Sequence, residues 1–266
     1  MQVKTPLVLK LGGVILDTPG ALDSLFSTIQ GIWDSQVRQS ESKRPVVIVH
    51  GGGCVVDFLM KQLNLPIVKK EGLRVTPSSQ IDIVAGALSG TANKNIMAHA
   101  INAKLMPVGL SLGDATIAEV TPISDELGHV AHATAGSGKL LTLLLSHGYL
   151  PIISSIGITA DGLLMNVNAD EAAVVIAKSI GGSLALLADV SGVLDENKKL
   201  IPSMNRAQAN ELIDKGVITD GMVVKVNAAL DAASNLGGAV TIASFKDFDK
   251  LPLLFKNQSM GTLMIP

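Results

Sequence analysis

Short runs of apolar residues recur along the chain, and the first two end directly in glycine. Residues 7–13 read LVLKLGG, and residues 45–53 read PVVIVHGGG. Each run is too short for a buried helix and stops at glycine, which is typical of a buried strand that runs into a tight turn. Four further apolar runs predict strands of the same kind, at residues 106–112, 150–156, 184–188 and 240–243.

Helical spacing of apolar residues fills the stretches between these runs. In residues 17–33, five apolar side chains recur every three or four positions and share one side of a helix. Asn205 is expected to cap one further helix, and Ser78 or Ser79 another. The further helices are predicted at residues 54–63, 80–105, 140–147, 170–180, 205–215 and 222–236. Because strands and helices alternate, the sequence predicts right-handed βαβ units around a parallel sheet, the α/β class.

The remaining apolar segments predict shorter strands. Residues 117–120 and 129–133 flank a turn-rich acidic segment and predict a hairpin. Residues 163–168 are expected to be extended, residues 201–204 to form a short strand, and residues 261–265 an edge strand. Neither an internal repeat nor a linker of distinct composition divides the chain.

Composition narrows the class of protein. Of 266 residues, 47% are hydrophobic and 17% are charged, which indicates a globular chain. The net charge is −2, and no basic run points to nucleic acid. A single cysteine, Cys54, excludes an intrachain disulfide and fits a reducing compartment. No apolar stretch approaches the ~20 residues of a membrane span, so we expect a soluble cytoplasmic protein.

The ends of the first two strands carry candidate chemistry. Lys10 lies near the carboxyl end of its strand, where open α/β sheets form their ligand crevice. The glycines after both strands leave backbone N–H groups free to face an anion. His50 and Cys54 lie beside them, and we interpret both as structural because neither has an evident chemical partner. A lysine at a sheet edge is the alternative for Lys10, and tight turns are the alternative for the glycines.

A second candidate cluster follows the extended segment. Asn166, Asn168 and Asp170 occupy alternate positions, so in an extended chain their side chains point the same way. That face is costly to bury unless it binds something, although an N-cap and turn for the next helix would also explain it. Lys225, just inside a predicted helix, is able to reach the same crevice or to be an ordinary surface lysine.

Taken together, six motifs identify a resemblance. LVLKLGG, VIVHGGG, GLRVT, MNVNAD, DVSGVL and ITDGMVVKV occur in this order from one end of the chain to the other. They resemble the amino acid kinase family, and within it the branch that phosphorylates N-acetyl-L-glutamate. The resemblance implies a three-layer αβα sandwich around a mostly parallel central sheet of about eight strands. It also implies an N-terminal lobe, residues 1–162, that binds acetylglutamate and dimerises, and a C-terminal lobe, residues 163–266, that binds ATP.

The implied reaction is transfer of the ATP γ-phosphoryl group to the γ-carboxylate of N-acetyl-L-glutamate, in arginine biosynthesis. Lys10 and Lys225 would approach the phosphoryl group, with Asp170 holding both ammonium groups. Mg²⁺ would be held through the ATP phosphates and water, with no metal site made by the protein. The phosphate-binding residues would be Gly12 and Gly13, and the substrate-binding residues Gly52, Gly53, Arg74, Asn166 and Asn168. The ATP-binding residues would be Asp189, Val190, Ser191, Gly192, Val193, Leu194, Val217, Ile218 and Thr219.

Two alternatives stay open from the sequence. The chain could phosphorylate another small carboxylate, or it could be a non-catalytic sensor that binds a nucleotide or an amino acid. Arginine-sensitive relatives carry an extra N-terminal helix, and only six residues precede the first strand here. We therefore expect a homodimer that is insensitive to arginine.

Overall fold

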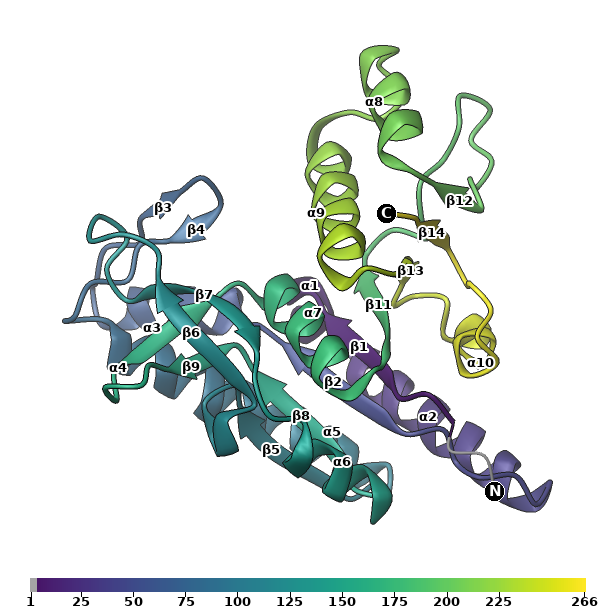
Figure 1. Ribbon diagram of the computed structural model, residues 1–266, viewed down its shortest axis with the longest axis horizontal. Helices are drawn as coiled ribbons and strands as arrows, with labels where there is room; N and C mark the ends of the chain where they lie inside the picture. Colours follow the sequence, from purple (N-terminus) through teal and green to yellow (C-terminus); the bar gives the residue numbers. More distant parts are fainter. Residues whose placement is uncertain (1–3) are drawn as a thin grey trace.

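The fold is built on one large sheet, seen in a computed structural model that describes residues 4–266 (Figure 1). The sheet has eight strands in the order β12-β14-β13-β11-β1-β2-β8-β5. All neighbouring pairs from β13 to β5 are parallel. The strands are β1 (Leu7–Leu11), β2 (Val46–His50), β5 (Pro107–Ser111), β8 (Leu150–Ser154), β11 (Ser183–Ala188), β12 (Ser203–Met204), β13 (Val240–Ser244) and β14 (Thr262–Met264).

Helices lie on both faces of this sheet. They are α1 (Gly13–Asp17), α2 (Ala21–Arg38), α3 (Gly53–Gln62), α4 (Ile81–Ala85), α5 (Asn93–Asn102), α6 (Lys139–Ser146), α7 (Ala169–Ile180), α8 (Arg206–Asp214), α9 (Asp220–Leu236) and α10 (Leu251–Phe255), with a π-helix η1 (Gly86–Ala92) and 3₁₀ turns η2 (Asp114–Thr116) and η3 (Phe248–Lys250). The three layers confirm the predicted α/β class and αβα sandwich.

Two smaller sheets complete the chain. The second sheet has four strands in the order β6-β7-β10-β9, and β6 and β7 make the predicted hairpin. Its strands are β6 (Ala118–Pro122), β7 (Val130–Ala135), β9 (Ile156–Ile158) and β10 (Leu164–Val167). The third sheet is a hairpin of two short strands, β3 (Lys69–Lys70) and β4 (Leu73–Arg74), which was not expected from the sequence.

The side-chain alternation of β1 decides which way its lysine points. Leu7, Leu9 and Leu11 belong to the core under α2, α5 and α10, whereas Val8 belongs to the core under α7 and α9. Because successive side chains of a strand point to opposite faces, Lys10 shares the face of Val8. The lysine therefore points toward α7.

The same alternation places His50. In β2, Val47 and Val49 pack on the α7 side, and Val46 and Ile48 pack on the α5 side. His50 follows Ile48 by two residues and so points toward α5. Lys10 and His50, near the ends of two neighbouring strands, thus point to opposite faces of the sheet.

The stretch 80–105 differs from the continuous α-helix expected there. The helix α4 passes into the π-helix η1 at Gly86, and α5 begins at Asn93. Gly86 and Gly90 both lie in this π-helical segment. The N-terminal residue Gln80 makes no side-chain cap, so the expected cap by Ser78 or Ser79 was wrong. The expected cap by Asn205 is confirmed, as part of a capping box.

The sheet edge and the predicted lobe boundary both involve strand neighbours that the sequence did not predict. The predicted edge strand, now β14, lies between β13 and β12, so the edge is the two-residue β12, which lies within the short strand predicted at residues 201–204. The expected lobe boundary at residue 162 falls between β9 and β10, which pair with each other. The first strand after that boundary is therefore hydrogen-bonded to the N-terminal half. In Figure 1 the last third of the chain, green to yellow, stands beside the rest and is joined to it where β11 lies next to β1.

Candidate active site

A cavity of about 220 Å³ opens where β1 and β11 end, side by side in the sheet. Apolar residues such as Val14, Leu187 and Phe245 form part of its wall. Its polar wall brings together residues that are far apart in the sequence: Lys10, Gly12, Gly13, Asp170, Asp189 and Lys225. Six predicted site residues thus face one cavity at the carboxyl ends of parallel strands, where ligands of open α/β sheets bind.

A larger hollow of about 1020 Å³ lies elsewhere, between α2 and the C-terminal segment. Lys4 pairs there with Glu41 at 2.7 Å. The buried Arg44 donates from Nε to the Thr5 carbonyl and from Nη2 to Ser183 Oγ. These charges join chain segments to one another, and none of the predicted site residues lines the hollow.

Lys10 reaches Asp170 across the α7 face of the sheet. Its Nζ lies 2.8 Å from Asp170 Oδ1, and the lysine side chain is only 15% exposed. Asp170 is in the first turn of α7, where the helix dipole favours a negative charge. The sheet and the helix therefore hold this ion pair from two sides.

Lys225 pairs with a different carboxylate from the one expected. Its Nζ donates to Asp189 Oδ1 at 2.5 Å, so Asp170 holds Lys10 alone in this structure. Asp189 directly follows β11 and faces α9, which carries Lys225, and this adjacency explains the pairing. The hydrogen bond from Lys225 is the main cause that lowers the pKa of Asp189. The two lysines therefore enter the cavity on two separate aspartates.

The glycine loops offer fewer free donors than the sequence suggested. The Gly12 N–H donates to the Leu187 carbonyl at 3.2 Å, because the ladder between β1 and β11 continues one residue further. In this structure the Gly12 N–H therefore has a partner within the chain, although Gly12 lines the cavity. Gly13 begins α1, where N–H groups have no partner within the helix.

Gly52 and Gly53 lie where β2 passes into α3. Gly52 has a φ of +150°, and a Cβ there would lie 3.0 Å from Leu88 Cδ2 and 3.1 Å from Ala92 Cβ. Only glycine fits both this conformation and this space. Gly53 is exposed at the start of α3, beside the guanidinium of Arg74.

Arg74 is held against α3 by a residue that the sequence reasoning missed. Its Nη2 donates to Asp57 Oδ1 and lies 3.4 Å from the Gly53 carbonyl oxygen, and its Nη1 lies 3.5 Å from Met60 Sδ. Asp57 also lies 3.8 Å from Lys69 Nζ. The position of Asp57, one helical turn after Gly53, is the only signal that could have identified it.

Asn166 and Asn168 serve different parts of the fold. Asn166 Nδ2 donates to Thr76 Oγ1 at 3.3 Å, and Thr76 in turn donates to the Arg74 carbonyl. Asn168 caps α7 by accepting the Asp170 N–H at 2.8 Å. Asn166 therefore contacts the part of the site that holds Arg74, whereas Asn168 contacts the helix that carries Asp170. Thr76, which is fully buried, was quoted in a motif but not recognised as part of the site.

The residues expected around ATP differ in what their side chains can reach. Asp189 lines the cavity. The side chains of Val193 and Ile218 are buried in the hydrophobic core, so these two could meet a ligand only through their backbone. Gly192 is also buried and has a φ of +139°. A Cβ added to Gly192 would lie only 2.6 Å from Leu200 Cδ1. The exposed or half-buried members of this set are Asp189, Val190, Ser191, Leu194, Val217 and Thr219.

His50 and Cys54 lie close to the glycine loop. His50 is buried, which lowers its pKa to about 4 and keeps it neutral at pH 7. Its Nδ1 lies 2.6 Å from the Gly51 carbonyl oxygen, and its Nε2 lies 3.0 Å from Asn93 Nδ2. Burial, followed by the nearby Asp17, raises the pKa of the Cys54 thiol. A raised pKa disfavours the reactive thiolate.

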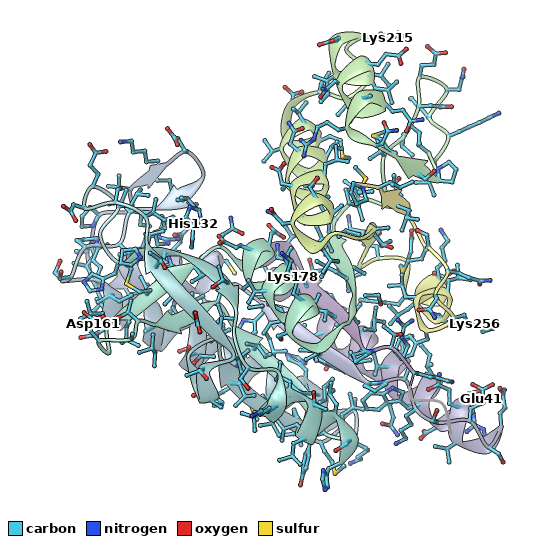
Figure 2. The ribbon with its side chains drawn as sticks, viewed as in Figure 1. Glu41, His132, Asp161, Lys178, Lys215 and Lys256 are labelled. Carbon is cyan, nitrogen blue, oxygen red and sulfur yellow. The ribbon has the colours of Figure 1, made fainter. Side chains whose placement is uncertain are left out.

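Charge outside the cavity is dispersed. In Figure 2, Glu41, Lys215 and Lys256 lie at separate places on the periphery. No group of three or more His, Cys, Asp or Glu residues that could hold a metal ion occurs within residues 4–266. In the same part of the chain, no helix combines the length and the apolar character needed to cross a membrane.

Comparison with known proteins identifies the family. The chain is 57% identical to "Acetylglutamate kinase" of Serratia proteamaculans (strain 568) over 260 residues, which are 98% of this chain and 99% of that protein. Its structure superposes on that of smu.665 from Streptococcus mutans UA159 with a TM-score of 0.75 and 26% identity, covering 98% of both chains. Carbamate kinase from Giardia lamblia, bound to AMP-PNP, shares the fold with a TM-score of 0.65 and 15% identity over 100% of this chain and 99% of that one. The model of the amino acid kinase family matches residues 5–244, and this chain belongs to that family.

Proposed function

We propose that this protein transfers the γ-phosphoryl group of ATP to the γ-carboxylate of N-acetyl-L-glutamate, in arginine biosynthesis. The observation that carries the proposal is the 57% identity, over 98% of the chain, to an acetylglutamate kinase. The cavity with two lysines, two aspartates and glycine backbone is the chemistry such a reaction needs.

The reaction needs charge relief more than proton transfer. A γ-carboxylate has a pKa near ~4.3 and is already ionised at neutral pH, so no general base is required. The obstacle is the repulsion between this carboxylate and the phosphates of ATP. Catalysis then rests on positioning and on donors that face the charge of the transferring group.

In this proposal the two lysines supply that positive charge. Lys10 would contact the phosphoryl group from the sheet, and Lys225 would contact it from α9. Asp170 would act as a positioning residue for Lys10, and Asp189 would hold Lys225 until the nucleotide binds, because each aspartate is bonded to one of these lysines. The N–H groups of Gly13, Gly52 and Gly53 would donate to the phosphoryl group and the substrate.

Arg74 would recognise the α-carboxylate of the substrate. A planar guanidinium binds a carboxylate through two parallel hydrogen bonds, which a lysine cannot do. Arg74 already bonds Asp57, so the substrate carboxylate would join or replace Asp57 at the guanidinium. Asn166 would act at the same end of the substrate, because Thr76 links it to Arg74.

The nucleotide would lie against the C-terminal part, along residues 189–194 and 217–219. Mg²⁺ neutralises phosphate charge when it is bound with ATP. The two carboxylates of the cavity are each bonded to a lysine, so the phosphates and water would supply most of its ligands. Acetylglutamate would bind on the side of the N-terminal lobe, where Arg74 lies.

We further propose that the enzyme is a cytoplasmic homodimer. Phe58 on α3 and Leu63 directly after it are 60% and 55% exposed, and a Cβ at Gly86 or Gly90 would meet open space. A second copy of the chain could cover these apolar side chains and pack closely on the glycines. Light scattering is expected to give twice the 27.6 kDa chain mass, and a monomer would contradict the proposal. Phe58→Glu should then shift the equilibrium toward monomer.

An ADP-release assay tests the activity. The purified chain is given ATP and Mg²⁺ with N-acetylglutamate, glutamate, aspartate or UMP in separate reactions. ADP release that depends on N-acetylglutamate supports the proposal. Release with another acceptor would identify a different kinase, and binding of ATP without release for any acceptor would favour a sensor.

A further inference from the structure

We propose that His50 is a latch for the peptide bond between Gly51 and Gly52, and that it fixes the direction of the Gly52 N–H. His50 would then be a positioning residue for phosphoryl transfer, acting through a backbone donor without touching a substrate. This inference rests on the proposed function, in which that N–H is a donor.

The hydrogen bonds of His50 specify its tautomer. Nδ1 lies 2.6 Å from the Gly51 carbonyl oxygen, which can only accept, so Nδ1 must carry the proton. Nε2 lies 3.0 Å from the amide nitrogen of Asn93, which can only donate, so Nε2 must be unprotonated. Burial disfavours the imidazolium as well. The ring is thus a neutral donor aimed at one backbone carbonyl.

Asn93 is itself fixed in one orientation. Its side chain is 1% exposed, and the same amide nitrogen donates to the Ile152 carbonyl at 2.8 Å. Turning the amide would place its oxygen against both the Ile152 carbonyl and Nε2 of His50. The amide therefore has one satisfied orientation, and that orientation selects the histidine tautomer that donates to Gly51.

The geometry of the peptide bond carries the effect to the next residue. The Gly51 carbonyl and the Gly52 N–H belong to one peptide unit, and the structure contains no cis peptide bond among residues 4–266. In a trans peptide these two groups point in opposite directions. His50 lies on the α5 side of the sheet, so holding the carbonyl there turns the Gly52 N–H away from α5. Within the described residues, this N–H meets no acceptor of the chain.

A latch is needed because glycine flanks this peptide on both sides. Without a Cβ on either residue, rotation of the peptide plane meets little steric resistance. Gly52 already has a φ of +150°, a conformation outside the range of other residues. The π-helix η1 supports the loop from behind, through Leu88 and Ala92, and Asn93 follows it directly. One segment thus packs against Gly52 and orients the amide that orients His50.

Two substitutions separate the hydrogen bond from His50 to Gly51 from the hydrogen bond between His50 and Asn93. In His50→Asn the amide nitrogen takes the place of Nδ1 and can still donate to Gly51, whereas the acceptor for Asn93 is lost. In His50→Gln the end of the side chain takes the place of Nε2 and can still bond Asn93, whereas the donor to Gly51 is lost. Ser154→Ala is the matched control, because Ser154 is the buried neighbour of His50 on β8 and its hydroxyl bonds Ser89 Oγ at 2.7 Å.

We expect His50→Gln to lower kcat with N-acetylglutamate by about 100-fold, the effect of losing one donor to a developing charge. Its KM for ATP should change less than about threefold, while His50→Asn retains kcat within about tenfold of the wild type. Ser154→Ala should retain kcat. Equal losses in both His50 variants, or a His50→Gln enzyme as active as the wild type, would overturn the proposal.

A measurement on the unmodified protein covers the case in which a variant does not fold. Imidazole ¹⁵N NMR at pH 7 should show His50 neutral with its proton on Nδ1, and a proton on Nε2 would overturn the latch. The two proposals fail in different ways. A wild-type enzyme that releases no ADP with N-acetylglutamate contradicts the proposed function, whereas an active wild type with equally impaired His50 variants contradicts only the latch.

Discussion

The two lysine–aspartate pairs of the cavity are alike in chemistry and different in how they are held. Lys10 lies on a central strand of the sheet and is 15% exposed, and its partner Asp170 is 33% exposed. Lys225 lies on α9, and both it and Asp189 are more than a third exposed. Ion pairs open to water are screened and weak, whereas a shielded pair keeps its geometry. The first pair is therefore a fixed element, and the second can exchange its carboxylate for a phosphate.

The difference also follows from the elements themselves. A strand with neighbours on both sides cannot move without breaking ladder hydrogen bonds, and β1 lies between β11 and β2. α9 is not part of the hydrogen-bonded ladder, and side chains such as Val226 and Ala229 hold it in the core. We expect the nucleotide to find Lys10 already in place and to draw Lys225 away from Asp189.

The strongest test of this comparison is Lys10→Ala. Loss of a preorganised charge next to the transferring group should lower kcat about 1000-fold, the upper end of the effect of one such donor. ADP release measures kcat, and a thermal melt checks that the fold survives. Unchanged turnover would refute the lysine role.

Lys225→Ala should have a smaller effect. Because its ammonium is solvated and must reorganise, we expect a loss in kcat of about 100-fold, the lower end of the same range. The same assay with both variants sharpens the comparison. A larger loss for Lys225 than for Lys10 would reverse the interpretation of fixed and movable charges.

Arg74→Ala should separate substrate binding from chemistry. Hydrogen bonds to charged groups contribute about 1.5–3 kcal/mol, so KM for N-acetylglutamate should rise by about 10- to 100-fold. KM for ATP should stay the same, because Arg74 lies beside α3 and not among the residues of the two lysine pairs. Weaker ATP binding in this variant would show that the assignment of the two sides is wrong.

The smallest expected effects concern stability. Asp189→Asn removes an exposed pair and should change the free energy of unfolding by less than about 1 kcal/mol. Asp170→Asn leaves the shielded Lys10 without a counter-ion and should cost more, about 1–3 kcal/mol. Urea unfolding of both variants measures the difference. Equal losses would mean that the two pairs are held alike.

The fold could be predicted largely from local patterns. Short, mainly apolar runs predicted the central strands, and the spacing in residues 17–33 predicted α2, because burial of one face or both faces imposes those periods. The interruption of residues 80–105 by η1 could not be predicted, since a π-helix leaves no periodicity of its own over seven residues. The position of β14 inside the sheet could not be predicted either, because the local pattern that predicted a strand at residues 201–204 does not say which strand it pairs with.

The candidate site was predictable as a set of residues and less so as a set of contacts. Lys10, Asp170 and Lys225 were named from motifs, and the structure brings them to one cavity. Their roles remain predictions. Which aspartate holds which lysine depends on distances between α7, α9 and β11, which no spacing in the chain encodes. Asp57 and Asn93 were missed because each looks like an ordinary polar residue on a helix.

The sequence by itself determined the elements, their order and the residues able to do chemistry, because these depend on side-chain type and on periods of a few residues. Only the tertiary structure decided the pairing of the two lysines, the loss of the Gly12 donor to Leu187, and the contact of Arg74 with Asp57. Such contacts join residues that are distant along the chain. They follow from how packed layers align in space, and the energy of that alignment is shared by the whole core.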